Sequence, residues 1–109
     1  ELVLGRDRVA FRYVQPGQVL RTQIRVGAYG NETKFKLTGA EIDIPGLKAE
    51  VENTIIGEEG QVHLQGKALT KEDPLVQESG GRIQGTLKIF TDLPSTPVME
   101  VPVSYMIRQ

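Results

Sequence analysis

Few residues in this chain have the side chains that chemistry needs. There is one histidine, His63, and no cysteine, which excludes thiol nucleophiles, thiolate metal sites and sites built on several histidines. A serine hydrolase would need His63 to meet a serine and a carboxylate, but Ser79, Ser95 and Ser104 all lack the GxSxG context of a nucleophile elbow. His63 occupies a polar position in an alternating segment. We therefore expect an exposed or cross-strand-paired imidazole.

Closely spaced carboxylates are the other candidate chemistry. Calcium needs six to eight oxygen ligands, and no DxDxDG-like spacing is present. Paired acids for sugar hydrolysis would need a cleft, which a small domain seldom provides. We predict solvated charges, with no catalytic residue, no cofactor and no metal ion. The pairs in question are Glu41 with Asp43, Glu58 with Glu59, and Glu72 with Asp73.

Charge and aromatic content argue against nucleic-acid and sugar binding. The formal net charge is −1 and there is no tryptophan, so neither a basic face interleaved with aromatics nor a large stacking platform is expected. Most of the aromatic rings alternate with polar residues so that they should point into the core, and only two have no clear position on either face. The inward rings are Phe11, Tyr13, Phe35 and Tyr105, and the loose ones are Tyr29 and Phe90.

The elements that position these residues are strands. The segment Val9 to Tyr13 alternates, Pro16-Gly17 makes a turn, and Leu20 to Val26 alternates again. After Gly30-Asn31 comes a third strand with Phe35 and Leu37 inward. A fourth strand follows the Pro45-Gly46 turn, and a fifth carries Val62, Leu64 and Ala68 after a turn at Gly57 to Gly60.

The C-terminal thirty residues give the clearest pattern. In GGRIQGTLKIFTDLPSTPVMEVPVSYMIRQ, Ile83, Leu87 and Ile89 share one parity, and Met99 to Ile107 repeats the alternation after a turn with two prolines. This predicts an antiparallel hairpin. The acidic segment Thr70 to Gly81, with Pro74 inside it, is expected to be a loop, and no helix is predicted. About seven short strands favour an all-β, immunoglobulin-like, two-sheet antiparallel sandwich.

Shared inward parity predicts the core of that sandwich. Truncating one of its large members to alanine should cost roughly 2–5 kcal/mol. The predicted core residues are Phe11, Leu20, Ile24, Phe35, Leu37, Leu64, Leu87, Ile89, Val101 and Val103.

Glycine and proline positions give finer predictions. Ile42 and Ile44 have the opposite phase to Leu37, so a bulge is expected near Gly39. Gly85 takes an inward position where a side chain would not fit. Pro102 cannot donate to a β-ladder, so Met99–Ile107 is expected to be an edge strand near Pro102 or to be paired there on one side only. Docking of a partner by strand addition at this edge is therefore disfavoured.

Charges are distributed unevenly between strands and turns. Acidic residues concentrate in turns and loops, while cationic ones take outward strand positions, where their stems cover apolar surface and discourage edge-to-edge pairing. The alternative is a mildly basic face that meets an acidic partner or a neighbouring domain. The cationic residues are Arg21, Arg25, Lys34, Lys36, Lys67, Arg82, Lys88 and Arg108.

The strand and turn order, closed by GxIxGxLxIFTDxPxxPxxxVPVxY, resembles bacterial immunoglobulin-like domains of unknown function, which are similar in form to the major sperm protein and hydin-type domains. Related domains often carry cysteines where this chain reads Ile44-Pro45-Gly46-Leu47, so a metal or redox role is not carried over. The resemblance implies a sandwich fold and an extracytoplasmic setting in the periplasm, cell envelope or medium, and no particular activity.

We therefore expect residues 1–109 to form a single domain excised from a longer chain. Its expected role is that of a non-catalytic structural or protein-interaction module of a bacterial envelope or secreted protein. The partner would be a protein or a neighbouring domain, with no nucleic acid, no membrane span and a monomeric state. Two alternatives stay open: a carbohydrate- or ligand-binding module, which predicts a concave and partly aromatic patch, and a small hydrolase, which predicts His63 in a cleft beside a carboxylate.

Overall fold

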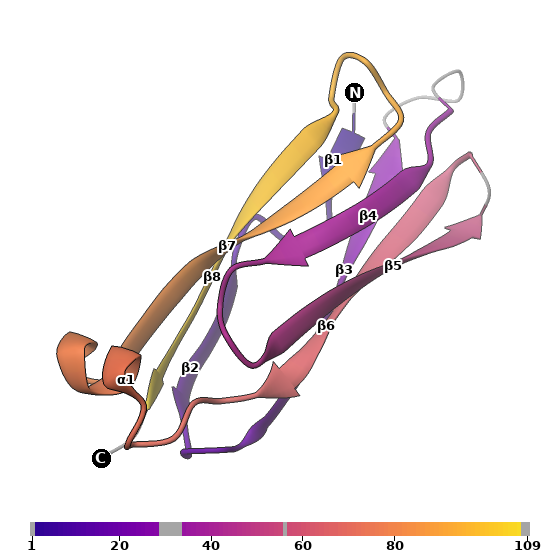
Figure 1. Ribbon diagram of the computed structural model, residues 1–109. Helices are drawn as coiled ribbons and strands as arrows, with labels where there is room; N and C mark the ends of the chain where they lie inside the picture. The colour runs from indigo at the N-terminus through magenta and orange to yellow at the C-terminus, as the bar shows by residue number, and fades with distance from the viewer. Residues whose placement is uncertain (1, 29–33, 56, 108–109) are drawn as a thin grey trace.

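The computed structural model describes residues 2–28, 34–55 and 57–107, and within them the chain forms two sheets of four strands packed face to face (Figure 1). Sheet A has the order β1-β3-β6-β5, and sheet B has the order β2-β8-β7-β4. A short helix, α1, precedes β7. The elements are β1 (Leu2–Leu4), β2 (Val9–Val14), β3 (Val19–Ala28), β4 (Leu37–Ile42), β5 (Leu47–Ile55), β6 (Glu59–Lys67), α1 (Pro74–Ser79), β7 (Arg82–Thr91) and β8 (Val98–Ile107).

The strand order is that of an immunoglobulin-like sandwich. β1 and β2 are two halves of the first strand, the first half in sheet A and the second in sheet B. Lettered along the chain, the sheets become ABED and A′GFC, which is the constant-type immunoglobulin arrangement with a split first strand. Neighbouring strands are antiparallel except β2 and β8, which run parallel. The predicted all-β, two-sheet fold is confirmed.

Inward-facing side chains of both sheets form the core. The C-terminal hairpin has the predicted pairing, with Leu87 opposite Val101 and Ile83 opposite Tyr105, all buried. Of the ten predicted core residues, only Phe11 is not fully buried; it packs half-exposed against the cluster. The nine buried ones are Leu20, Ile24, Phe35, Leu37, Leu64, Leu87, Ile89, Val101 and Val103.

The prediction for β2 was wrong at Tyr13, which is 67% exposed. The cause is a backbone irregularity at Arg12, whose φ is 63°. Between the pairs Ala10–Ser104 and Tyr13–Met106, β2 has one residue more than β8. The extra residue changes the face on which the following side chains lie, so Tyr13 faces solvent and Val14 is buried.

The segment predicted to be a loop contains α1. Its N-cap is Asp73, whose carboxylate accepts a hydrogen bond from the Leu75 amide at 2.9 Å, and Pro74 stands in the first turn. Gly80 ends the helix in the left-handed region with φ 70°. Val76 is buried and anchors the helix to the core. The prediction of no helix was wrong because these capping signals enclose only six residues, too few for a helical period to show.

The two glycines with predicted structural roles differ in whether the space around them requires a glycine. The register of β4 against β7 shifts between Leu37 and Gly39, which confirms the bulge. A Cβ at Gly39 would meet only Phe90, at 3.9 Å, so space does not require glycine there. At Gly85 a Cβ would overlap the Asp43 carboxylate and lie 2.5 Å from Cγ1 of Ile44. Close packing therefore explains Gly85.

Around Pro102, β8 is paired on one side only, which is one of the two arrangements that the sequence predicts. β8 pairs with β7 along its whole length, with Pro102 opposite Thr86. β2 joins its other side only from Val103 onward. The missing N–H of Pro102 thus stands where no second neighbour needs it, although β8 as a whole is an interior strand.

The open edges of the two sheets meet where β4 lies beside β5. The Asn53 side-chain amide accepts a hydrogen bond from the Leu37 N–H at 2.9 Å and donates one to the Leu37 carbonyl at 3.1 Å. This one side chain on β5 therefore forms the two hydrogen bonds with the β4 backbone that a peptide group would form.

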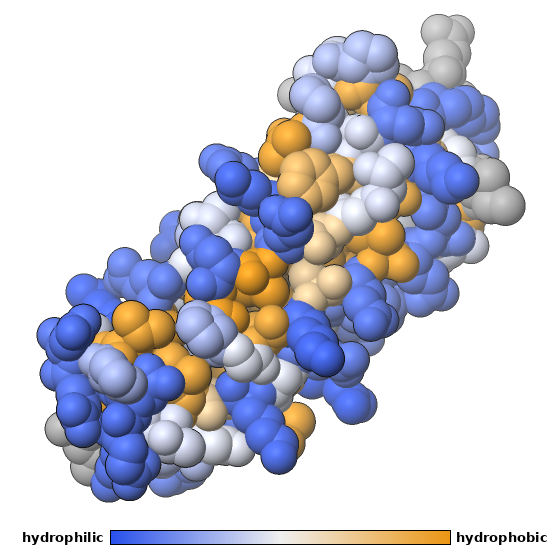
Figure 2. Space-filling view, viewed as in Figure 1, coloured by the Kyte–Doolittle hydropathy of each residue, from blue (hydrophilic) through white to orange (hydrophobic). Residues whose placement is uncertain are grey.

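On the face of the molecule seen in Figure 2, hydrophobic areas are interrupted by hydrophilic side chains. This face does not present one continuous apolar docking patch.

The sandwich is elongated, measuring 49 × 21 × 18 Å. β1 begins at one end of the long axis and β8 finishes at the other, so the termini lie at opposite ends (Figure 1).

Candidate functional site

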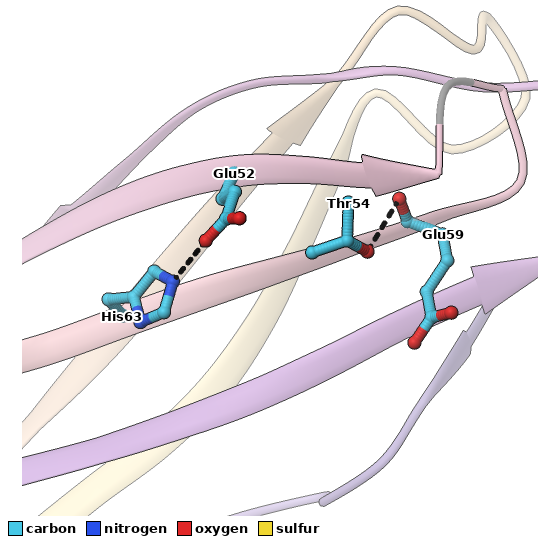
Figure 3. A network of polar contacts seen from close by, with 4 residues as sticks. All are labelled: Glu52, Thr54, Glu59 and His63. Atoms are coloured by element: carbon cyan, nitrogen blue, oxygen red, sulfur yellow. Dashed lines mark hydrogen bonds and ion pairs between the residues drawn. The ribbon is translucent and has the colours of Figure 1, made fainter.

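His63 lies on β6, on the outer face of sheet A, and is half-exposed. Its Nε2 is 2.9 Å from Oε1 of Glu52 on the neighbouring strand β5 (Figure 3). The register places Glu50 directly opposite His63, so the Glu52 contact is diagonal. Such diagonal neighbours are within reach of long side chains. The contact is a hydrogen bond when the imidazole is neutral and an ion pair when it is protonated, and the predicted cross-strand pairing is confirmed.

Further polar contacts continue along the same face. The Thr54 hydroxyl donates to the backbone carbonyl of Glu59 at 3.2 Å (Figure 3), and the Glu59 carboxylate is 2.9 Å from Nε of Arg25. Glu58 forms an exposed ion pair with Lys34 at 3.3 Å. Exposed pairs of this kind contribute about 0–1 kcal/mol each. The contacts of Arg25, Thr54 and Glu59 join β3, β5 and β6, whereas the Lys34–Glu58 pair joins the segment before β4 to the β5–β6 turn.

The components of a serine hydrolase are not brought together. His63 belongs to sheet A, whereas Ser104 lies on β8 in sheet B. Ser79 ends α1, where its hydroxyl donates to the Leu75 carbonyl at 2.7 Å. Ser95 lies in the β7–β8 connection. The only carboxylate contact recorded for His63 in the described residues is the one with Glu52.

At least one carboxylate of each predicted pair has a structural partner. Asp43 accepts a hydrogen bond from the Thr86 amide at 2.8 Å and thereby joins the β4–β5 connection to β7. Glu41 and Asp43 line a shallow hollow of about 140 Å³ together with Lys88. Asp73 caps α1, and its neighbour Glu72 is exposed. Across the described ranges no three acidic or histidine side chains gather closely enough to hold a metal ion.

Among the residues that the structure describes, Tyr105 is the one titratable group whose pKa is clearly shifted. It is buried on β8, and its hydroxyl oxygen accepts a hydrogen bond from the Leu69 amide at 3.0 Å. Burial raises the pKa of Tyr105, because the ionised form loses its hydration there. Its position ties the segment after β6 to the core.

The cations and rings mostly follow the sequence predictions. Phe35 and Tyr105 are buried, and Phe90 is half-buried. Tyr29 and Arg108 lie outside the described residues. The other predicted outward cations are exposed: Arg21, Arg25, Lys34, Lys36, Lys67, Arg82 and Lys88.

The feature that sequence reasoning missed is a groove on the outer face of sheet B. Two hollows of about 370 and 360 Å³ adjoin there, since Gln84 and Ser104 line both. Tyr13 and Arg82 line the second hollow. We call this feature the β2 groove. The alternation pattern assigned Tyr13 to the core, and for this reason the sequence did not predict the groove.

The chain resembles solved structures in fold alone. No protein-family model matches it, and no curated protein matches it. A protein of unknown function from Porphyromonas gingivalis W83 superposes over 96% of this chain with a TM-score of 0.69 at 16% identity. A Bacteroides ovatus GH5 xyloglucanase, solved with a XXXG heptasaccharide, superposes over 100% with a TM-score of 0.55 at 9% identity. Mouse clustered PcdhgC3 EC1-3, a cadherin, superposes over 98% with a TM-score of 0.56 at 12% identity.

In each of these structures the matching part is a fraction of a longer chain. This chain spans 46% of the Porphyromonas protein, 19% of the xyloglucanase and 33% of the cadherin fragment. The comparisons indicate no enzyme family for this chain. Among the residues described, no helix is long and apolar enough to cross a membrane. The chain has an immunoglobulin-like, all-β sandwich fold.

Proposed function

We propose that this chain is a non-catalytic structural or protein-interaction module of a larger bacterial envelope or secreted protein. The observation that carries the proposal is the placement of the termini at opposite ends of a 49 Å sandwich (Figure 1). A module with this geometry adds length to a chain and holds its neighbours apart. Domains whose termini lie close together would instead fold the chain back on itself.

Two further observations support a structural role. Three of the polar side chains considered as candidate chemistry have structural contacts: Asp73 caps α1, Asp43 binds the Thr86 amide, and His63 contacts Glu52. The three similar structures also contain the fold as one part of a longer chain.

The spacer role can be tested with two copies joined end to end and examined by small-angle X-ray scattering. One copy has a Cα radius of gyration of 15.2 Å and a long axis of 49 Å. Two copies in line should give a radius of gyration of about 29 Å, whereas two copies packed side by side should give about 18 Å. A flexible glycine-serine linker in place of the native ends is the control. A compact value with the native ends would contradict the spacer role.

The extracytoplasmic setting is a separate part of the proposal and needs its own test. Protease added to intact cells that make the full-length protein should cleave it at the outer surface, or after the outer membrane alone is permeabilised. A known cytoplasmic protein serves as the protection control. Full protection of the protein until the cytoplasm is opened would contradict this setting.

A further inference from the structure

The β2 groove is defined by the pairing of three neighbouring strands. β8 lies between β2 and β7, and the register sets Ala10, Ser104 and Gln84 in one row across the sheet. The next outward row is Tyr13, Met106 and Arg82. Since neighbouring strands lie about 4.8 Å apart, the Cα atoms of Tyr13 and Arg82 are about 10 Å apart. Half-exposed Met106 forms an apolar floor between an aromatic ring and a guanidinium group.

The backbone of β2 is irregular where it forms one side of this groove. Arg12 has φ 63°, a left-handed conformation that costs a residue with a Cβ about 1–2 kcal/mol. The extra residue returns Val14 to the core, but a glycine would do so with less strain. Instead an arginine occupies the position and lines the groove, and the irregularity turns Tyr13 outward to 67% exposure. Strain of this kind at the surface is typical of functional sites.

The polar groups of the groove are available to a ligand. Within the described residues, the side chains of Arg12, Arg82, Gln84 and Ser104 make no hydrogen bond or ion pair with the rest of the chain. They supply two guanidinium groups, an amide and a hydroxyl. Of the described residues that line the two hollows, only Asp7 is acidic, and its carboxylate lies 3.8 Å from Nε of Arg8. The groove therefore has an excess of positive charge.

The chemistry of these groups selects the class of ligand. An aromatic ring beside a shallow hollow, with amide and hydroxyl groups around it, suits the apolar face and the hydroxyls of one sugar ring. Guanidinium groups bind carboxylates with two parallel hydrogen bonds. A peptide cannot add as a strand on the floor of the groove, because β8 is already paired with both β2 and β7 from Val103 onward.

We propose that the β2 groove binds a saccharide unit that carries a carboxylate, with the ring over Met106, Tyr13 against its apolar face, Arg82 and Arg12 on the carboxylate, and Gln84 and Ser104 on hydroxyls. This inference is independent of the spacer role, because it concerns an outer face of sheet B, whereas the spacer role concerns the placement of the two termini.

The test is titration of the ¹⁵N-labelled protein by NMR with three carboxylated probes: oligogalacturonate, oligoalginate and hyaluronan oligosaccharides. At least one should give saturable shifts centred on Tyr13, Ser104 and Gln84. Neutral galacto-oligosaccharides and a hexaglutamate peptide should give none at the same concentrations. Tyr13→Ala and Arg82→Gln should each weaken binding at least tenfold, and Tyr13→Phe should keep most of it.

Arg21→Gln is the matched control, since it removes the same charge from an exposed position of β3 in the other sheet. It should leave binding unchanged. Tyr13 and Arg82 are both exposed, and unchanged amide spectra away from the groove will verify that their variants fold. The proposal is overturned if none of the three probes binds at the groove, if the neutral sugar or hexaglutamate binds there equally well, or if Arg21→Gln weakens binding as much as Arg82→Gln.

Discussion

Replacing Gly85 with alanine tests whether close packing between the sheet and the β4–β5 connection limits the stability of this fold. The added Cβ would overlap the Asp43 carboxylate and lie 2.5 Å from Cγ1 of Ile44, which is 2% exposed. Ile44 has little freedom to move because it is part of the core. Relief of the overlap must come from Asp43, whose carboxylate accepts the hydrogen bond of the Thr86 amide at 2.8 Å.

The expected loss follows from these two contacts. Overpacking in a well-filled site costs about 1–3 kcal/mol, and weakening a hydrogen bond to a charged acceptor costs up to about 1.5–3 kcal/mol. Because one movement of Asp43 relieves part of the overlap, we expect a combined loss of about 2–4 kcal/mol in the free energy of unfolding. Urea unfolding should show the midpoint lowered by about 1–2 M at an unchanged m-value.

Two further variants make this test specific. Gly27→Ala is the matched control, because its Cβ would meet nothing within 4 Å; it should be neutral or stabilise by up to about 1 kcal/mol. Asp43→Ala removes one of the two obstacles, so Gly85→Ala should cost less in that background than in the parent. If Gly85→Ala lies within about 0.5 kcal/mol of the parent, or costs the same in both backgrounds, the packing explanation is wrong.

Four other predictions test different parts of the structure. Arg12→Gly should raise the melting temperature, since it relieves about 1–2 kcal/mol of left-handed strain against about 0.5–1 kcal/mol of added chain entropy; a clear decrease would contradict the conformation described for Arg12. Tyr105→Phe should cost about 1–3 kcal/mol, because it leaves the Leu69 amide without its acceptor. The pKa of Tyr105 is raised above 10.0, so its contribution is fully present below pH 10.0 and is lost as the pH rises through the raised value; urea melts should show a smaller alkaline loss in Tyr105→Phe than in the parent. Leu87→Ala should cost about 2–5 kcal/mol in the same assay. Millimolar Ca²⁺ or Zn²⁺ should leave the melting temperature unchanged, and a saturable rise would reveal a metal site.

Alternation along the sequence predicted most of the fold because one face of each strand packs against the other sheet. Leu87 and Ile89 on β7, and Val101 and Val103 on β8, are buried as their parity requires. Turns at Pro16-Gly17 and Pro45-Gly46 also lie where the sequence predicts them. These features depend on local chemistry and on a strict two-residue period.

The β2 groove could not be predicted in the same way. A left-handed arginine at Arg12 has no sequence signature, since that conformation usually requires glycine. One extra residue then reverses the parity of everything after it, so Tyr13 could not be placed from alternation. The helix α1 was predictable in principle, because Asp73-Pro74 and Gly80 mark its ends.

The split first strand also determines how the molecule would carry a mechanical load. β2 and β8 run parallel, and the chain continues from the start of β2 toward one end of the long axis and from the end of β8 toward the other (Figure 1). A pull on the two ends therefore draws these strands in opposite directions along their length. Their hydrogen bonds lie across the pull and are loaded together rather than opened one after another. Resistance to stretching should therefore depend on the short ladder from Val9–Val103 to Val14–Ile107.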